Sequence, residues 1–188
     1  KWKCNMMNIT QNAVDNGFLI FKETRIPKDN LLDKLGKVSD DGIYTSKIES
    51  NDKRFGLTLS ALGAGRILLV SNGQIQFLNA LTIGIRFAAI RRQFPLKSDI
   101  PETHILEYQS VQYRLAPKLG ALFVYRWLGV YLNNQWLEKL KLFQNGDFKA
   151  LNEIHAIISS IKPIVTLDCL DSIKDIRHLI GGLGYSRY

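Results

Sequence analysis

A long amphipathic stretch from Phe55 to Ile90 constrains the fold of this chain more than any other feature. Its apolar side chains recur every three or four positions, the spacing of one helical face. They include Leu59, Leu62, Ala64, Ile67, Val70, Ile75, Leu78, Leu81 and Ile85. Pro95 ends the pattern, since proline cannot continue a helix. So long an apolar stripe needs other long helices to cover it, which predicts a helical bundle.

Two further segments have the same character. The first runs from Ile105 to about Phe143, and Pro117 predicts a kink within it. The second runs from Phe148 to about Ile161, is expected to break or bend at Pro163, and resumes toward Ile180. Short connections between long helices indicate an antiparallel bundle. Its predicted buried positions include Leu59, Leu62, Ile67, Leu119, Phe123 and Ile157.

The N-terminal part differs in character. An apolar run over Phe18–Phe21 predicts a short strand, and the turn residues 40–42 precede a second predicted strand at 43–45. We therefore expect residues 1–52 to be the end of a β-domain and residues 53–188 to be the helical bundle.

Three glycines, Gly63, Gly65 and Gly73, lie inside the first predicted helix, where each costs roughly 1 kcal/mol of helix propensity. Two explanations are open. The small residues allow either close helix packing or the approach of a ligand, and we favour packing.

Several functional classes are disfavoured by composition and spacing. The three histidines are scattered without metal-ligand spacing, so no metal site is predicted. The two cysteines, Cys4 and Cys169, form no paired motif. Arg66, Arg86 and the pair Arg91-Arg92 interrupt the apolar runs, so no membrane span is expected.

A net charge of +8 is compatible with nucleic acid or with a small anionic ligand. The aromatic residues follow the spacing of a helical core and not of an exposed stacking surface, which argues against nucleic acid. Arg91, Arg92 and Lys97 cluster at a predicted helix end. There they either complement the helix dipole or bind phosphate, because guanidinium groups match phosphate oxygens. The glycine-rich run 181–184 is, by itself, typical of a helix C-cap.

Several ordered motifs resemble those of acyl-CoA oxidases. They are Asp15-Asn16-Gly17-Phe18-Leu19 with Arg25-Ile26-Pro27 and Asn30-Leu31-Leu32, Lys53-Arg54-Phe55-Gly56, Gly65-Arg66, Ile85-Arg86-Phe87 with Arg91-Arg92-Gln93-Phe94, Ile105-Leu106-Glu107-Tyr108-Gln109 with Tyr113-Arg114-Leu115, Glu153-Ile154-His155 with Lys162-Pro163, and Arg177 with Gly181-Gly182-Leu183-Gly184-Tyr185. The resemblance covers nearly the whole chain. It implies a mainly α fold, namely the C-terminal four-helix-bundle domain of the acyl-CoA dehydrogenase/oxidase fold, preceded by the end of its middle β-domain.

The resemblance also implies a cofactor and site residues. Arg91, Gln93 and Phe94 match positions that contact FAD, as do Gly181 and Gly182. Arg66 matches an arginine that contacts the CoA part of the substrate. The implied partners are fatty acyl-CoA, molecular oxygen and a second subunit in a homodimer that shares the FAD sites, and the implied location is the peroxisome.

The implied reaction is FAD-dependent α,β-desaturation of fatty acyl-CoA, with electrons passed to oxygen to give hydrogen peroxide. The family's general base is a glutamate expected beyond Tyr188, so no catalytic residue is named within these residues. Pro95 stands where the family has glycine, and Ile180 where it has cysteine. The alternatives are an acyl-CoA dehydrogenase and a non-catalytic helical scaffold.

Overall fold

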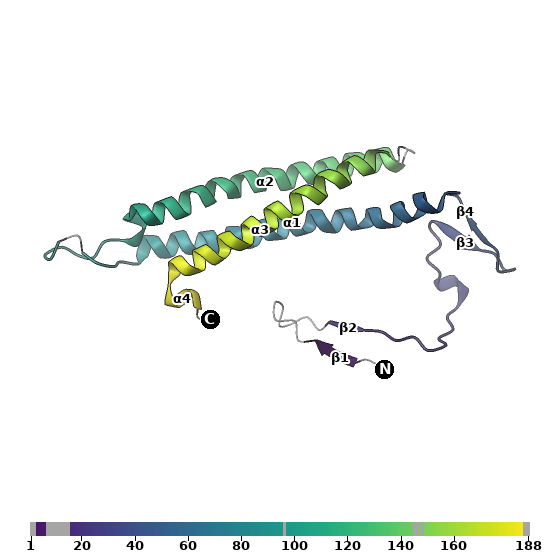
Figure 1. Ribbon diagram of the computed structural model, residues 1–188, viewed down its shortest axis with the longest axis horizontal. Helices are drawn as coiled ribbons and strands as arrows, with labels where there is room; N and C mark the ends of the chain where they lie inside the picture. Colours follow the sequence, from purple (N-terminus) through teal and green to yellow (C-terminus); the bar gives the residue numbers. More distant parts are fainter. Residues whose placement is uncertain (1–2, 7–15, 96, 145–146, 148, 186–188) are drawn as a thin grey trace. The chain divides into compact units, whose positions relative to one another are not determined.

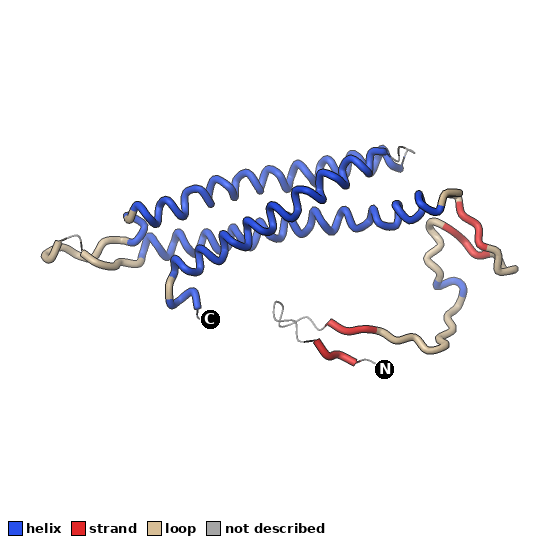
Figure 2. The backbone as a smooth tube through the Cα atoms, viewed as in Figure 1, coloured by secondary structure: helices blue, strands red, loops and turns tan. Residues whose placement is uncertain are grey.

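The computed structural model describes residues 3–6, 16–95, 97–144, 147 and 149–185. The chain divides into two compact units, Lys1–Arg54 and Phe55–Tyr188. Most of the described residues are helical, as expected (Figure 2).

The first unit contains two antiparallel strand pairs. Strand β1 (Lys3–Met6) pairs with β2 (Asn16–Phe18), and β3 (Gly36–Val38) pairs with β4 (Tyr44–Ser46). A short 3-10 helix, η1 (Lys28–Asn30), lies between the two pairs in the sequence.

The second hairpin confirms the predicted turn and the strand after it. Gly42 adopts a φ of 80°, which glycine tolerates best, and its amide donates to the Ser39 carbonyl over 3.1 Å. The strand expected at 18–21 is correct only at its first residue. Residues 19–21 are exposed, and among the described residues no strand pairs with them to supply backbone hydrogen bonds.

Helix α1 (Asn51–Ile90) begins four residues before the predicted start. Ser50 explains the difference. Its hydroxyl oxygen accepts a hydrogen bond from the Lys53 amide over 3.4 Å, and its carbonyl accepts one from the Arg54 amide over 3.1 Å. Such a cap satisfies amides that have no partner inside the helix.

Helices α2 (Gln109–Gln144) and α3 (Lys149–Ile180) complete the long helices, and Figure 1 shows all three lying along one another. A 3-10 turn, η2 (Ile105–Glu107), precedes α2, and a four-residue helix, α4 (Gly182–Tyr185), follows α3.

Of the break or bend predicted at Pro163, the break does not occur, because α3 runs through this residue without interruption. Proline removes one backbone hydrogen bond, but here its ring lies on the exposed face. Ile158 and Val165, on either side, are buried against the other helices. Packing on both sides therefore keeps the helix in one piece. Helix α2 likewise continues through Pro117.

The core draws on all three long helices. Fully buried side chains include Val70, Phe77 and Leu81 of α1, Leu132 of α2, and Ile154, Ile158, Val165 and Ile176 of α3. These residues form one continuous apolar cluster.

The prediction of six buried positions is correct for some of them and wrong for others. Ile67 is buried and Ile157 is half-buried against the core, whereas the side chain of Leu59 lies outside the described residues. The prediction is wrong for three positions: Leu62, Leu119 and Phe123 are 54%, 41% and 64% exposed. Their helices are apolar on more than one face, so periodicity alone cannot tell which apolar residues face the other two helices.

The glycines of α1 favour the packing explanation at one clear position. A Cβ atom on Gly63 would lie 2.5 Å from the ring of Trp136, so α1 and α2 approach closely there. A Cβ atom on Gly73 would make ordinary contacts with Cys169 of α3, and one on Gly65 would meet no atom of the described residues within 4 Å.

Helix α1 is also long and apolar enough, by length and composition alone, to cross a membrane. The expectation that arginines interrupt every such run was therefore too strict. One such helix is weak evidence, because core helices of soluble proteins have the same length and composition.

Candidate functional site

Two segments that the sequence singled out lie at the same end of the helical unit. The segment 91–94 follows the C-terminal end of α1, and the glycine turn at 181–182 follows the C-terminal end of α3 (Figure 1). The packing of Gly84 against Ile176 and Leu115 holds the ends of the three long helices together. Residues 90 positions apart in sequence can thus contribute to one region.

The backbone of segment 91–94 is fixed by hydrogen bonds to the segment that enters α2. The Gln93 amide donates to the Thr103 carbonyl over 3.0 Å, and the Thr103 amide donates to the Phe94 carbonyl over 3.1 Å. The Ile105 amide donates to the Arg91 carbonyl over 2.9 Å. These bonds give the segment a defined shape although it lies outside any helix.

Phe94 has an unusual backbone conformation. Its φ is 56°, in the left-handed region that a bulky residue rarely adopts. Its side chain is 67% exposed. The hydroxyl of Tyr108 donates to the Gln93 carbonyl over 2.7 Å and lies 3.3 Å from the Phe94 carbonyl. Strained backbone of this kind is concentrated at functional sites.

The two neighbouring arginines have different roles. The Arg92 guanidinium donates to the Glu102 carbonyl over 3.0 Å, and Arg92 pairs with His104 as an isolated bridge. Arg92 therefore stabilises the loop. Arg91 is exposed, and its guanidinium makes no hydrogen bond or ion pair within the described part of the chain. Arg91 is therefore free to bind an anion.

An unsatisfied buried atom lies beside these arginines. The Nδ1 atom of His104 is buried and has no hydrogen-bond partner among the described residues. Buried polar atoms are nearly always paired, so such an atom indicates a missing partner or water.

The glycine turn at 181–182 lies at the same end of the helical unit as segment 91–94. Gly181 has a φ of 71°, and the Gly184 amide donates to its carbonyl over 2.9 Å. Among the described residues, no atom lies within 4 Å of a Cβ atom added at Gly181 or Gly182, so their backbone is open to an approaching group.

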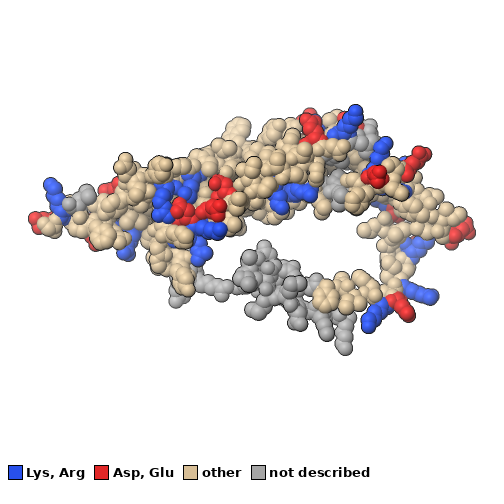
Figure 3. Space-filling view, in the orientation of Figure 1, with Lys and Arg blue, Asp and Glu red and all other residues tan. Residues whose placement is uncertain are grey.

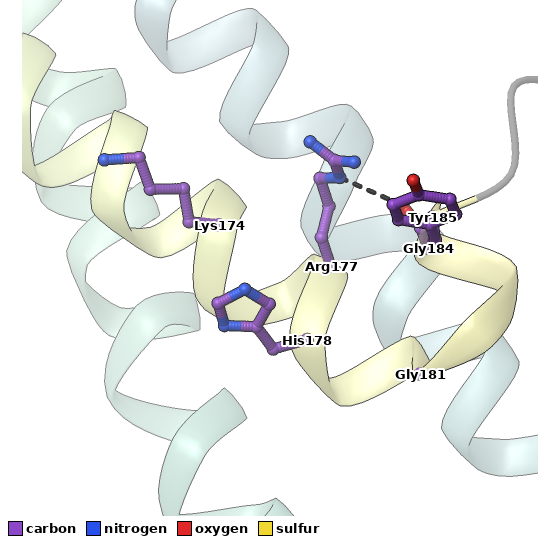
Figure 4. Close-up of a pocket in the computed structure, with 6 residues that line it drawn as sticks. All are labelled: Lys174, Arg177, His178, Gly181, Gly184 and Tyr185. Atoms are coloured by element: carbon purple, nitrogen blue, oxygen red, sulfur yellow. Dashed lines mark hydrogen bonds between the residues drawn. The ribbon is translucent and has the colours of Figure 1, made fainter.

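A shallow pocket of about 400 Å³ lies beside this turn (Figure 4). Its basic lining residues are Lys174, Arg177 and His178 of α3. The Arg177 Nε donates to the Gly184 carbonyl over 3.0 Å, drawn as the dashed line in Figure 4. Arg177 thus fixes the turn and adds positive charge to the pocket.

Arg66 lies apart from the other candidate residues. It is on α1, roughly 36 Å from the helix end at about 1.5 Å per residue. Its Nη1 atom is 3.4 Å from Nδ1 of His155 on α3. The structure therefore brings Arg91, Gln93 and Phe94 to the same end of the bundle as Gly181 and Gly182, but not Arg66.

Polar contacts between α2 and α3 fix how these two helices align. Arg114 and Lys118 of α2 both pair with Asp175 of α3, the lysine over 2.7 Å. The Arg114 guanidinium holds the pKa of the Asp175 carboxyl below its usual value. Tyr125 donates to Asp168 over 2.7 Å further along the same seam. Burial and this neighbouring carboxylate raise the pKa of the Tyr125 phenol.

Sequence reasoning did not identify Tyr108 or Thr103 as part of the site. Tyr108 belonged to a motif that resembles the acyl-CoA oxidases, but its contact with Gln93 joins residues 15 positions apart through a loop. Among the described residues, no cluster of three or more His, Cys, Asp or Glu side chains is arranged to hold a metal ion.

Comparison with known proteins identifies the class of this fold. Residues 59–188 match the model of the acyl-CoA oxidase C-alpha1 domain. The fold is that of the C-terminal helical domain of acyl-CoA oxidases, and the chain belongs to the acyl-CoA oxidase family.

Individual relatives agree with this membership. The chain is 39% identical to peroxisomal acyl-coenzyme A oxidase 2 of Arabidopsis thaliana, over 93% of this chain and 25% of that protein. It superposes on Arabidopsis thaliana acyl-CoA oxidase 1 with a TM-score of 0.81 at 31% identity, covering 93% of this chain and 26% of that one.

A third relative was solved with ligands. Caenorhabditis elegans acyl-CoA oxidase-2, bound with FAD, ascaroside-CoA and ATP, superposes with a TM-score of 0.82 at 30% identity, covering 93% of this chain and 26% of that one. The chain spans about a quarter of the length of the relatives it matches.

Proposed function

We propose that this chain is part of an acyl-CoA oxidase that desaturates fatty acyl-CoA at the α,β bond in peroxisomal β-oxidation. Family membership supports the reaction class, and the name of a peroxisomal relative supports the location. The observation that carries the proposal is that two features lie at one end of the bundle. They are the Arg91 guanidinium, which has no partner within the described ranges, and the open glycine turn at 181–182.

The residues present fit FAD. Arg91 offers a guanidinium fork to a phosphate, and Gly181 and Gly182 leave room for a large group against the backbone. Gln93 and Phe94 follow Arg91 in the same segment, and the ring of Phe94 is exposed. A flavin nucleotide carries both the phosphates and the flat apolar ring that such a surface suits. FAD, when bound, supplies the hydride acceptor and the reaction with oxygen that yields hydrogen peroxide.

The candidate residues of this chain would bind and orient FAD and the acyl-CoA substrate, and they would not remove protons from the substrate. Arg91 would hold a phosphate, and the glycine turn would let backbone amides approach the cofactor. Arg66 would contact the CoA part of the substrate. The general base, a glutamate, is expected outside residues 1–188, so proton abstraction is assigned to no residue here.

Large apolar side chains are exposed on the surface of the helical unit, and we expect further protein to cover them. Large side chains such as Phe123, Trp127 and Tyr131 on α2 are more than half exposed. Figure 3 shows that much of the visible helical surface is uncharged. We assign this surface to a homodimer that shares its FAD sites, and residues 1–52 to the end of the middle β-domain.

The test is an assay of the full-length protein with FAD and a series of acyl-CoA thioesters. Acyl-CoA-dependent formation of hydrogen peroxide would support the oxidase. Turnover that reduces an artificial electron acceptor but consumes no oxygen would indicate an acyl-CoA dehydrogenase. A protein that binds no FAD would instead be the non-catalytic helical scaffold.

A further inference from the structure

The segment that carries Arg91 holds a backbone shape that its own sequence opposes. Phe94 is bulky and has a φ of 56°, and Pro95 follows it. A large side chain disfavours the left-handed region, and a following proline biases the preceding residue toward extended conformations. Contacts outside the segment must therefore hold Phe94 in place.

Those contacts come from two residues. The Thr103 amide donates to the Phe94 carbonyl over 3.1 Å, and the Tyr108 hydroxyl donates to the adjacent Gln93 carbonyl over 2.7 Å. Thr103 is buried, and Tyr108 is half-buried against the apolar core at the start of α2. Both donors are therefore anchored to the bundle, while Phe94 itself is exposed.

We propose that Tyr108 is a positioning residue for cofactor binding: its hydroxyl holds Gln93 and Phe94 in the left-handed turn that presents Arg91 and the Phe94 ring to FAD. This inference rests on the proposed function. Tyr108 acts through the backbone of its neighbours, so removing its hydroxyl alters FAD affinity without removing any FAD-contacting group.

The direct test is Tyr108→Phe in the full-length protein, which keeps the ring and removes only the hydroxyl. The loss of one neutral hydrogen bond predicts a dissociation constant for FAD about threefold to tenfold higher. Tyr113→Phe is the matched control, because Tyr113 is 81% exposed and its hydroxyl has no hydrogen-bond partner in the described part of the chain.

A second readout does not depend on FAD. Amide hydrogen exchange of Thr103 in the apo protein is expected to be faster in Tyr108→Phe, because the turn that protects this amide opens more often. Unchanged exchange would contradict the inference, since the hydroxyl would then not hold the turn.

A rescue experiment tests whether Tyr108 acts through Phe94. Asparagine adopts the left-handed region far more readily than phenylalanine, so Phe94→Asn needs the hydroxyl less. In the Phe94→Asn background, Tyr108→Phe is expected to raise the dissociation constant for FAD by less than about twofold. The reason is that asparagine adopts the left-handed conformation at a low free-energy cost without help from the hydroxyl. An equal loss of FAD affinity in both backgrounds would overturn the role of Tyr108, and so would equal FAD affinity of Tyr108→Phe and the unaltered protein. Neither result would overturn the proposed function. Failure of the unaltered protein to bind FAD would overturn the proposed function and this inference with it.

Discussion

The indole ring of Trp136 occupies the space beside Gly63 where any other residue would place its Cβ atom. That atom would lie 2.5 Å from the ring, well inside van der Waals contact. Trp136 is buried, so it has little room to move away. This contact between α1 and α2 therefore requires a glycine.

We predict that Gly63→Ala destabilises the protein by about 1–3 kcal/mol, because overpacking outweighs the gain in helix propensity. Gly65→Ala is the control: it faces open space, so only the gain in propensity of up to about 1 kcal/mol remains. Urea denaturation of both variants measures the difference. Equal stability of the two variants would show that Trp136 does not constrain this position.

The ion network between α2 and α3 predicts a pH-dependent contribution to stability. The pKa of Asp175 is lowered in the folded protein, chiefly by its hydrogen bond with Arg114. A lowered carboxylate pKa contributes stability above the unfolded value of 3.8, and that contribution is lost as the pH falls toward the folded value.

Asp175→Asn is therefore expected to cost about 1 kcal/mol at pH 7 and progressively less below about pH 4. Asp171→Asn, which breaks an exposed pair with Lys174 one turn away, is expected to cost less than about 0.5 kcal/mol. Denaturation of the two variants across this pH range tests the sign. A cost for Asp175→Asn that grows on acidification would contradict the assignment.

Cys169 should react poorly with alkylating agents. Its side chain is 2% exposed, and burial together with the nearby Asp168 carboxylate raises the pKa of its thiol from 9.0 to about 11. The thiolate is the reactive form, so at pH 8 the pKa alone predicts a rate about a hundredfold lower. Peptide mapping after iodoacetamide treatment of native and urea-unfolded protein measures this rate. Rapid native labelling would mean that α3 is not packed as described.

Local patterns predicted the helices well and their packing less well. The spacing of apolar residues such as Ile67 and Val70 was enough to predict α1, because apolar residues repeat there with the period of an α-helix. Burial of Leu62 and Phe123 was predicted wrongly, because these helices are apolar on more than one face. Pro163 was expected to break or bend α3, and it does not break the helix, because buried residues on either side keep it continuous.

Short motifs led to the proposal of Arg91 and Gly181 as site residues, and the structure places both at the same end of the helical unit. The contact of Tyr108 with Gln93 depends on how a loop folds back onto the start of α2, and no local pattern encodes that geometry. The left-handed conformation of Phe94 could not be predicted either, because phenylalanine before proline favours an extended backbone.

We propose that Arg91 binds a flavin phosphate while Arg92 stabilises its own loop. Titration of FAD into full-length apo protein carrying Arg91→Ala or Arg92→Ala distinguishes these two roles. A charge-assisted hydrogen bond to phosphate contributes roughly 1.5–3 kcal/mol, so Arg91→Ala is expected to weaken FAD binding about tenfold to a hundredfold. Arg92→Ala, whose guanidinium donates to Glu102 within the loop, is expected to weaken it much less. Equal FAD affinity of Arg91→Ala and the unaltered protein would contradict the account.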